Sequence, residues 1–227
     1  MNIQSWQFAV LLAAALVGAP AQSASQAEFD ARMSHDGLQR VNVKGISLAY
    51  VRPGATLAGY KRVKIDPVEV AFHKNWNPTR PGSRIPIGAA DREEIRTGLA
   101  KLVRDQFVKA LGEKGRYPVV NESGPDVLRL KPYIANLVVN APAPLSGGAP
   151  SHSFTMSAGE MTLLLELYDS ESGQIIARVV DRREGRTNQM ATMASGVTNI
   201  AQAEDIARAW AMILRNALDR AQGAAKK

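Results

Sequence analysis

Apolar positions recur with two different periods along the chain, and these periods predict where helices and strands lie. From Asp91 to Gly112, apolar residues return every three or four positions, which indicates an amphipathic helix. A similar stripe predicts a second helix from about Gln202 to Gln222. Alternating or continuous apolar positions predict strands over residues 62–72, 117–120, 126–140, 160–168 and 174–181.

The order of these elements predicts an α+β fold. Two amphipathic helices are expected to pack on a mostly antiparallel sheet of about four to five strands, as a two-layer sandwich. Pro67 has no N–H to donate, so the strand over residues 62–72 is expected at a sheet edge, with a bulge where its apolar face switches. Asp169 and Gly173 predict a tight hairpin, and residues 73–86 and 141–159 predict loops.

The N-terminus carries an apolar run of 12 residues, from Phe8 to Ala19. This run is too short to span a bilayer, which needs about 20 residues, but it has the length of a signal-peptide core. Small residues follow it, and they allow cleavage after Ala21 or Ala24. The segment before the run has no Lys or Arg, so a buried N-terminal helix and an uncleaved anchor remain alternatives. We expect export to the periplasm or the medium.

The chain is therefore expected to comprise four segments. They are a signal peptide (1–24), a flexible N-terminal arm (25–45), a single α/β domain (46–222) and a disordered tail (223–227). The 227 residues include no cysteine. This absence excludes disulfides, thiol catalysis and Cys-ligated zinc, and it also excludes a lipid anchor on an N-terminal Cys.

The distribution of charge along the chain suggests one class of ligand. The net charge is +7, and the region from Arg40 to Lys131 holds 18 basic and 9 acidic residues, whereas the remainder to the C-terminus holds 9 of each. A basic first half predicts, as an alternative function, binding of an anionic lipid or glycan. The basic residues are scattered rather than clustered, which favours a solvated surface and gives no reason to expect a nucleic-acid partner.

Motifs for catalysis are missing from the sequence. The three histidines do not show zinc-ligand spacing, and there is no phosphate loop, dinucleotide fingerprint or serine-nucleophile motif. We therefore expect no cofactor, no metal and no enzymatic activity. His73 with Asp66 and Glu69 comes nearest to an acid–base cluster. These three residues define the alternative of an envelope hydrolase or transferase.

Two polar regions are candidates for a contact surface. The surface comprises Trp76, His73, Arg182, Arg183 and Arg186. In the first region, Trp76 either is an exposed contact aromatic or folds back as a lid on the sheet. In the second region, the arginines either hold a phosphate or carboxylate or pair with neighbouring acidic residues at a solvated strand end.

The segment YVRPGATLAGYKRVKIDPVEVAF, residues 50–72, resembles a family of exported bacterial proteins catalogued only as domain of unknown function 3313. The match lies in the two tyrosines, Arg-Pro-Gly and Val-Lys-Ile-Asp-Pro, and Trp76 and the strand DVLRLKPYI support it. The resemblance covers nearly all of the expected mature chain. It implies an envelope location and no established activity. Many relatives are lipoproteins, and this chain departs from them because it has no cysteine.

These observations favour a non-enzymatic binding or assembly accessory of the cell envelope over an enzyme. The accessory is expected to bind an envelope protein partner, and the expected mature chain has no transmembrane segment.

Overall fold

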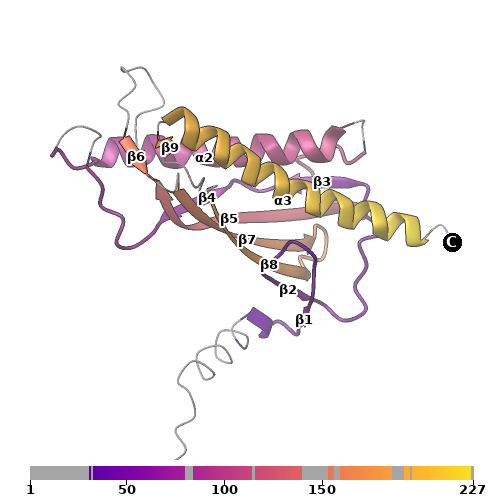
Figure 1. Cartoon of the computed structure of the whole chain (residues 1–227). Coiled ribbons are helices and arrows are strands. Elements are labelled where there is room, and N and C mark those ends of the chain that lie inside the picture. The colour runs from indigo at the N-terminus through magenta and orange to yellow at the C-terminus, as the bar shows by residue number, and fades with distance from the viewer. Residues whose placement is uncertain are drawn as a thin grey trace, which may run out of the picture.

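One mixed sheet covered on one face by two long helices makes up most of the computed structural model (Figure 1). The structure describes residues 31, 33–79, 84–113, 116–139, 153–155, 159–185, 192–194 and 196–225. The expected signal peptide, most of the loop over residues 141–159, and the terminal Lys226 and Lys227 lie outside the described residues.

The sheet has seven strands in the order β1-β2-β8-β7-β5-β3, and β4 also pairs with β5. They are β1 (Gln39–Val41), β2 (Leu48–Val51), β3 (Arg62–Ile65), β4 (Glu69–Phe72), β5 (Val127–Val139), β7 (Gly159–Asp169) and β8 (Ile175–Glu184). Strands β3 and β4 run parallel to β5, and the other pairs are antiparallel. The α+β class is confirmed. The expected four to five strands are too few.

A second, two-stranded sheet joins β6 (Ser153–Thr155) to β9 (Thr192–Ala194).

Strands β1 and β2 account for most of the strands that the main sheet has beyond the expected four to five. Strand β2 pairs with the hairpin strand β8, and β1 pairs with β2. The last part of the segment expected as a flexible arm, residues 25–45, is therefore paired into the sheet. Leu38 is only 3% exposed and packs with Tyr50 and Ile175.

The expected strand over residues 62–72 is divided into β3 and β4 around Pro67, and both parts lie along β5. Val63, Ile65 and Val70 all enter the main core. The predicted change of apolar face at Pro67 is therefore confirmed. The short strand expected over residues 117–120 is instead a single bridge between Val63 and Val119.

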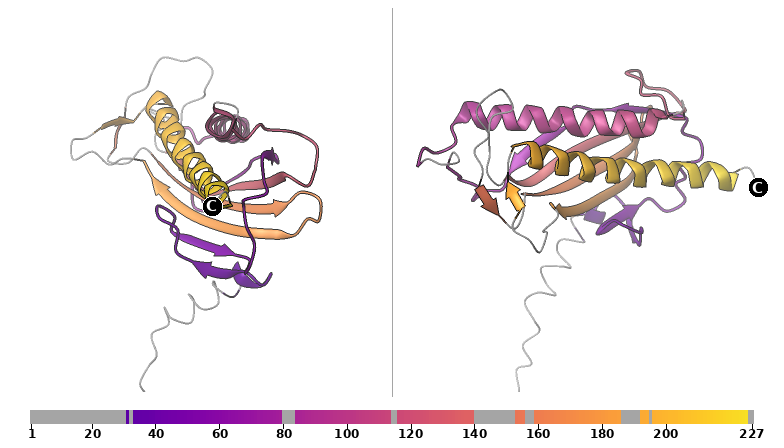
Figure 2. Two further views of the ribbon diagram at one scale, coloured as in Figure 1. Left: turned by 90° about the vertical axis from the view of Figure 1, so that its right-hand side faces the viewer. Right: turned by 45° about the horizontal axis from the view of Figure 1, so that its top comes forward.

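Helices α2 (Ala89–Gly112) and α3 (Gly196–Ala225) run side by side in the same direction on one face of the sheet (Figure 2). At the start of α2, the backbone N–H of Gly88 donates to the Asp91 carboxylate at 3.1 Å, which satisfies one free donor of the first turn. Helix α3 begins before and ends after the predicted range. It takes in part of the expected disordered tail over residues 223–227. Within the described residues, neither helix has the length and apolar character needed to cross a membrane.

The main core fills the space between the helices and the sheet. Its largest fully buried members include Phe107, Leu111, Leu128, Leu130, Ile134, Leu163 and Leu218. The residues that follow the C-terminal end of α2 are joined to α3 by polar bonds as well. Arg215 of α3 pairs with Glu113, and Tyr117 donates to Asp219 at 2.8 Å. This end of the helix pair is therefore closed.

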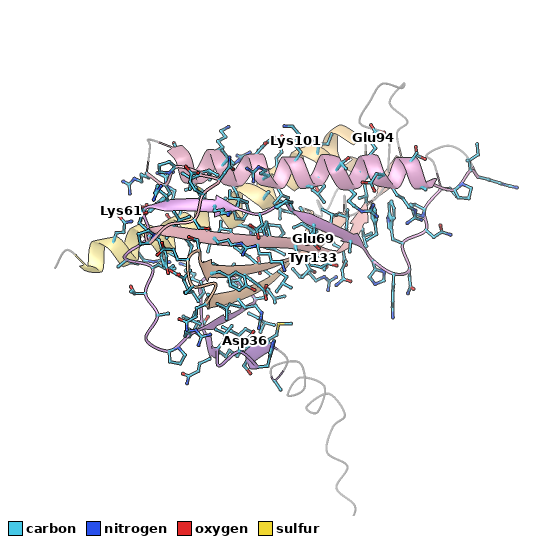
Figure 3. The ribbon with its side chains drawn as sticks, turned by 180° about the vertical axis from the view of Figure 1, so that it is seen from behind. Asp36, Lys61, Glu69, Glu94, Lys101 and Tyr133 are labelled. Carbon is cyan, nitrogen blue, oxygen red and sulfur yellow. The ribbon has the colours of Figure 1, made fainter. Side chains whose placement is uncertain are left out.

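The face of the sheet away from the helices carries polar pairs. Figure 3 shows Asp36, a member of one such pair, on the opposite side of the strands from α2. Arg178 of β8 donates to Glu166 of β7 at 2.8 Å and to Asp36 at 2.6 Å, and its side chain is only 8% exposed. Since Asp36 precedes β1, this pair fixes the start of the described chain against the sheet.

The outer edge formed by β3 and β4 is blocked by side chains of α2. Arg104 donates to the carbonyl oxygen of Ile65 at 2.8 Å, and Arg96 donates to that of Val70 at 3.2 Å. The Val63 carbonyl accepts from Val120 N–H at 2.9 Å. Backbone groups that an edge strand leaves unpaired are thus occupied.

Candidate functional site

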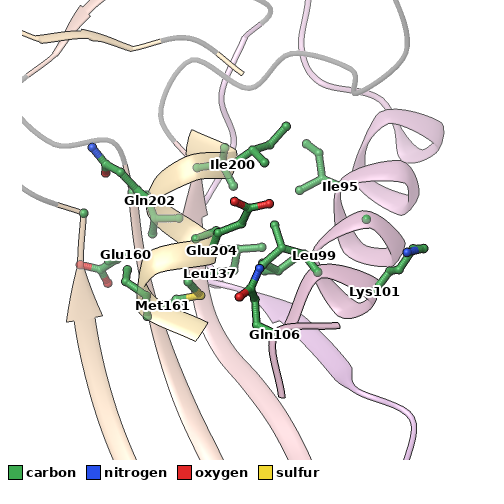
Figure 4. Close-up of a pocket in the computed structure, with 18 of the residues that line it drawn as sticks. Ile95, Leu99, Lys101, Gln106, Leu137, Glu160, Met161, Ile200, Gln202 and Glu204 are labelled. Carbon is green, nitrogen blue, oxygen red and sulfur yellow. The ribbon is translucent and has the colours of Figure 1, made fainter. Parts of the chain in front are cut away.

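A pocket of about 450 Å³ opens between the N-terminal halves of α2 and α3 (Figure 4). It lies at the end of the sheet where β5 and β8 finish and β7 begins. Its walls are aliphatic: Ile95, Leu99 and Leu102 from α2, Ile200, Ala203 and Ile206 from α3, and Leu137, Val138, Val139 and Met161 from the sheet. This volume and this lining are typical of small-molecule sites.

Helical spacing explains why the two helices present apolar walls. Ile95, Leu99 and Leu102 recur at intervals of four and three, so they share one face of α2. Gly98 adds no side chain next to this stripe. Gly159 lines the pocket at the start of β7, where a Cβ would lie 2.6 Å from the Val138 carbonyl oxygen. The sheet end of the pocket therefore depends on a close backbone approach.

Two glutamine side chains interrupt this apolar lining. Gln106 of α2 and Gln202 of α3 each have a buried Oε1 atom with no hydrogen-bond partner within the part of the chain that the structure describes. A buried polar atom without a partner costs about 1–3 kcal/mol. Such atoms are rare in folded proteins, and they often mark a position where a ligand or a water molecule binds.

Four charged residues complete the pocket. Lys101 pairs with Asp105 at 2.5 Å on α2, and Glu160 pairs with Arg182 at 2.6 Å. Glu204 of α3 makes no ion pair with any described residue. Figure 4 shows its carboxylate and the Gln106 amide projecting into the space between the helices, whereas Gln202 points away from α2. The described lining of the pocket thus combines apolar walls with one carboxylate, that of Glu204, for which no described residue provides a counter-charge.

Trp76 does not form an exposed contact surface. It is only 8% exposed, and its indole N–H donates to the Val139 carbonyl oxygen at 3.0 Å. Its ring stacks on Phe72 with the centroids 4.4 Å apart, and the Arg92 guanidinium lies 4.9 Å from its centroid. The alternative in which Trp76 folds back onto the sheet is the correct one, because Val139 and Arg92 hold it there.

The structure does not bring His73, Asp66 and Glu69 together. The backbone N–H of Asp66 donates to Leu130, whereas that of His73 donates to Leu137 farther along β5. An extended strand places these points roughly 20 Å apart. The Asp66 carboxylate also accepts two bonds from Arg129, at 3.0 and 2.7 Å. The acid–base cluster of the enzyme alternative is therefore wrong.

His73 has a local role instead, since its Nδ1 accepts from the backbone N–H of Asn75 at 3.2 Å. Within the described ranges, no three His, Asp or Glu side chains lie close enough to hold a metal ion together.

The two described arginines of the second contact region are engaged separately. Arg182 pairs with Glu160 and Glu184, and Arg183 bonds Asp181 at 2.8 Å. Glu160 raises the pKa of Arg182 through a side-chain hydrogen bond. Arg186 lies outside the described residues. The arrangement agrees with the alternative of paired charges at a strand end.

Arginines of the basic first half also bind groups of the protein itself. Arg62 pairs with Asp126, Arg129 with Asp66, and Arg52 donates to the Ile175 carbonyl oxygen at 2.7 Å. These side chains are less free to form an anionic-ligand surface. Binding of an anionic lipid or glycan and binding of an envelope protein partner both stay predictions.

None of the sequence patterns described above predicts the pocket, although one signal for it is present. Gln106 continues the positions Leu99 and Leu102 on the inner face of α2, and Gln202 stands one turn before Ile206 on α3. Polar residues within two apolar stripes indicate that the stripes do not face a fully dry core.

Comparisons with known proteins identify a family and distant structural likenesses. The model of the family described as protein of unknown function (DUF3313) matches residues 29–214. This match confirms the resemblance seen in residues 50–72. No curated protein matches the chain.

Three solved structures show likeness at low identity. Protein XCC0632 from Xanthomonas campestris, of the DUF330 family model, is 11% identical at a TM-score of 0.43, covering 78% of this chain and 94% of its own. The PelC dodecamer from Paraburkholderia phytofirmans is 10% identical at 0.37, covering 73% and 96%. A putative neuraminyllactose-binding hemagglutinin homolog from Helicobacter pylori is 13% identical at 0.36, covering 82% and 96%. Likenesses at these values do not establish a shared function.

Proposed function

The chain belongs to the DUF3313 family of proteins of unknown function, and we propose that it is a non-enzymatic binding module of the bacterial cell envelope. It takes an apolar ligand into the pocket between α2 and α3. The observation that carries this proposal is the pocket itself, with its volume of about 450 Å³, its aliphatic walls and its two amide oxygens that have no hydrogen-bond partner among the described residues.

The contrast between the two ends of the helix pair supports a binding role. At the C-terminal end of α2, Phe107 and Leu111 are almost fully buried, and Arg215 of α3 donates across to the Ala110 carbonyl oxygen of α2. At the N-terminal end, the same two helices line the pocket. Protein interiors are close-packed, so a pocket of this size beside a dense core is a specific feature of this end.

The composition of the lining favours binding over catalysis. None of the described residues that line the pocket is a histidine, serine, threonine or tyrosine. The side chains most often used as nucleophiles or as general bases near neutral pH are therefore missing from it. The carboxylates of Asp105 and Glu160 are held in ion pairs, which leaves Glu204 as a single carboxylate with no hydroxyl or imidazole nucleophile among the described lining residues. The lining thus suits recognition of a ligand rather than its conversion.

Binding is tested with a neutral apolar fluorophore, N-phenyl-1-naphthylamine, titrated into the purified protein. We expect saturable binding at one site per chain. Ala203→Trp places an indole in the pocket and should weaken binding about tenfold or more, which corresponds to about 1.4 kcal/mol. Ala201→Trp is the matched control, because Ala201 is exposed on the same helix and does not line the pocket.

The result that contradicts the proposal is specific. If the fluorophore does not bind, or if both tryptophan variants bind it as tightly as the unaltered protein, the pocket is not a ligand site. Circular dichroism and thermal unfolding of each variant show whether the altered helix still folds.

Location in the envelope belongs to the same proposal. Its support is the apolar run from Phe8 to Ala19 and the small residues after it. We expect the full chain, expressed in a Gram-negative bacterium, to appear in the periplasmic extract with Gln22 or Ser25 as its first residue. Recovery of the uncleaved chain in the cytoplasmic fraction would contradict export.

A further inference from the structure

The polar groups at the pocket have one property in common, which is that each offers a hydrogen-bond acceptor. Glu204 provides a carboxylate, and Gln106 and Gln202 provide their unpartnered amide oxygens. Figure 4 shows Glu204 and Gln106 reaching into the same space from opposite helices. A ligand that fits this space therefore needs a donor at the polar end of its apolar body.

Among the described residues, the charges around the pocket are balanced except at Glu204. Asp105 neutralises Lys101, Arg182 neutralises Glu160, and Arg208 bonds Asp205 at 3.3 Å. No described cation pairs with Glu204. A carboxylate beside an apolar wall attracts a cation more strongly than one in bulk water, because the local dielectric constant is lower.

We propose, as an extension of the proposed function on which it rests, that the ligand is an amphiphile with a protonated amine. Its aliphatic part lies between Leu99, Ala203 and Met161. Its ammonium group donates to the Glu204 carboxylate and the Gln106 amide oxygen. An ammonium group has three donors and no acceptor, so it matches a pair of acceptors better than a hydroxyl group does.

An anionic amphiphile is disfavoured by the same arrangement. A carboxylate or sulfonate head would lie next to Glu204 and would find acceptors where it needs donors. Lys101 does not remove this repulsion, because its ammonium group is held by Asp105 on the exposed side of α2. Specificity for the head group therefore follows from Glu204 and not from the apolar walls.

The test uses three amphiphiles with the same ten-carbon chain: decylamine, decan-1-ol and decane-1-sulfonate. Each displaces N-phenyl-1-naphthylamine from the purified protein at neutral pH, below its aggregation concentration. We expect decylammonium to bind about tenfold more tightly than the alcohol, and the sulfonate to bind more weakly than both.

Two variants that remove the same charge locate the preference. Glu204→Gln should abolish the advantage of decylammonium while leaving affinity for the alcohol within about twofold. Asp205→Asn should keep that advantage, because Asp205 is exposed, bonds Arg208 and does not line the pocket.

The outcomes separate this inference from the proposed function. Equal displacement by all three amphiphiles overturns the amine preference while the pocket remains a binding site. Loss of the preference in Asp205→Asn to the same extent as in Glu204→Gln also overturns it, because net charge would then explain the effect. If the fluorophore does not bind at all, the proposed function fails as well.

Discussion

The indole N–H of Trp210 donates to the Asp181 carboxylate at 2.7 Å, and this bond joins α3 to the central part of the sheet. Asp181 is 4% exposed, and it also accepts from the backbone N–H and the hydroxyl group of Ser47, at 2.9 and 2.7 Å. Arg183 completes the cluster at 2.8 Å. One carboxylate therefore links β8, the segment before β2, and α3.

Removal of this carboxylate should destabilise the protein strongly. Asp181→Ala leaves the Trp210 N–H and the Arg183 guanidinium without their acceptor, and we expect a loss of about 3–5 kcal/mol in the free energy of unfolding. Urea denaturation followed by circular dichroism measures this. The control is Asp205→Ala, which removes an exposed ion pair with Arg208 on α3. It should change the free energy of unfolding by less than about 0.5 kcal/mol. Equal losses in both variants would show that Asp181 has no special role.

The pKa of the same carboxylate predicts how the stability of the protein changes at low pH. Burial raises the pKa of Asp181, but hydrogen bonds from Arg183, Ser47 and Trp210 outweigh burial and hold that pKa below its ordinary value. Since the pKa is lower in the folded state, the stabilisation is fully present above the ordinary aspartate value of about 4 and is lost as pH falls below it. Asp181→Asn should flatten this acid limb in denaturation curves recorded from pH 6 down to pH 2. An unchanged slope would contradict the assignment.

The stacked ring of Trp76 should contribute more to the free energy of unfolding than its hydrogen bond to Val139 does. Trp76→Ala removes the contacts with Phe72 and Arg92, and we expect a loss of about 3 kcal/mol in unfolding free energy. Trp76→Phe keeps a ring beside Phe72 but loses the donor to Val139, and about 1 kcal/mol is expected. Urea denaturation of both variants gives the two values, and equal losses would show that the hydrogen bond dominates.

Two glycines should respond to alanine with opposite signs. Gly159 has a φ of +138°, and an added Cβ would lie 2.6 Å from the Val138 carbonyl oxygen, so Gly159→Ala should cost about 2 kcal/mol or more. Gly112 ends α2 with open space around the position of a Cβ, so Gly112→Ala should stabilise by about 0.5–1 kcal/mol. Thermal unfolding of both variants tests the pair, and stabilisation by Gly159→Ala would show that the backbone at Gly159 is not strained.

Periodicity predicted the elements whose partners lie close in sequence or whose stripes are long. Both helices, the hairpin of β7 and β8, and the break at Pro67 follow from local patterns. Strand β2 did not, because Leu48–Val51 is short, stands directly before a turn-rich stretch and pairs with β8, far along the chain. The burial of Trp76 also depends on a distant group, the Val139 carbonyl oxygen.

Local sequence patterns do not predict the pocket, for a related reason. Its lining comes from α2, α3, β5 and β7, and no motif spans these segments. Sequence periodicity shows that Leu99 and Ile206 face inward, but it does not show that they face a space rather than each other. Gln106 and Gln202 are the one signal in the sequence for a pocket, because an apolar stripe that is fully packed rarely includes side-chain amides without hydrogen-bond partners.

The arginines that cover the β3–β4 edge have a consequence for self-association. An exposed edge strand can template the addition of a strand from another molecule, and growth of that kind leads to aggregates. Here the carbonyl oxygens of Ile65 and Val70 already accept from Arg104 and Arg96. A neighbouring chain that approached this edge would have to displace two guanidinium groups before its first bond formed. At high local concentration, α2 therefore protects this edge against polymerisation of the protein.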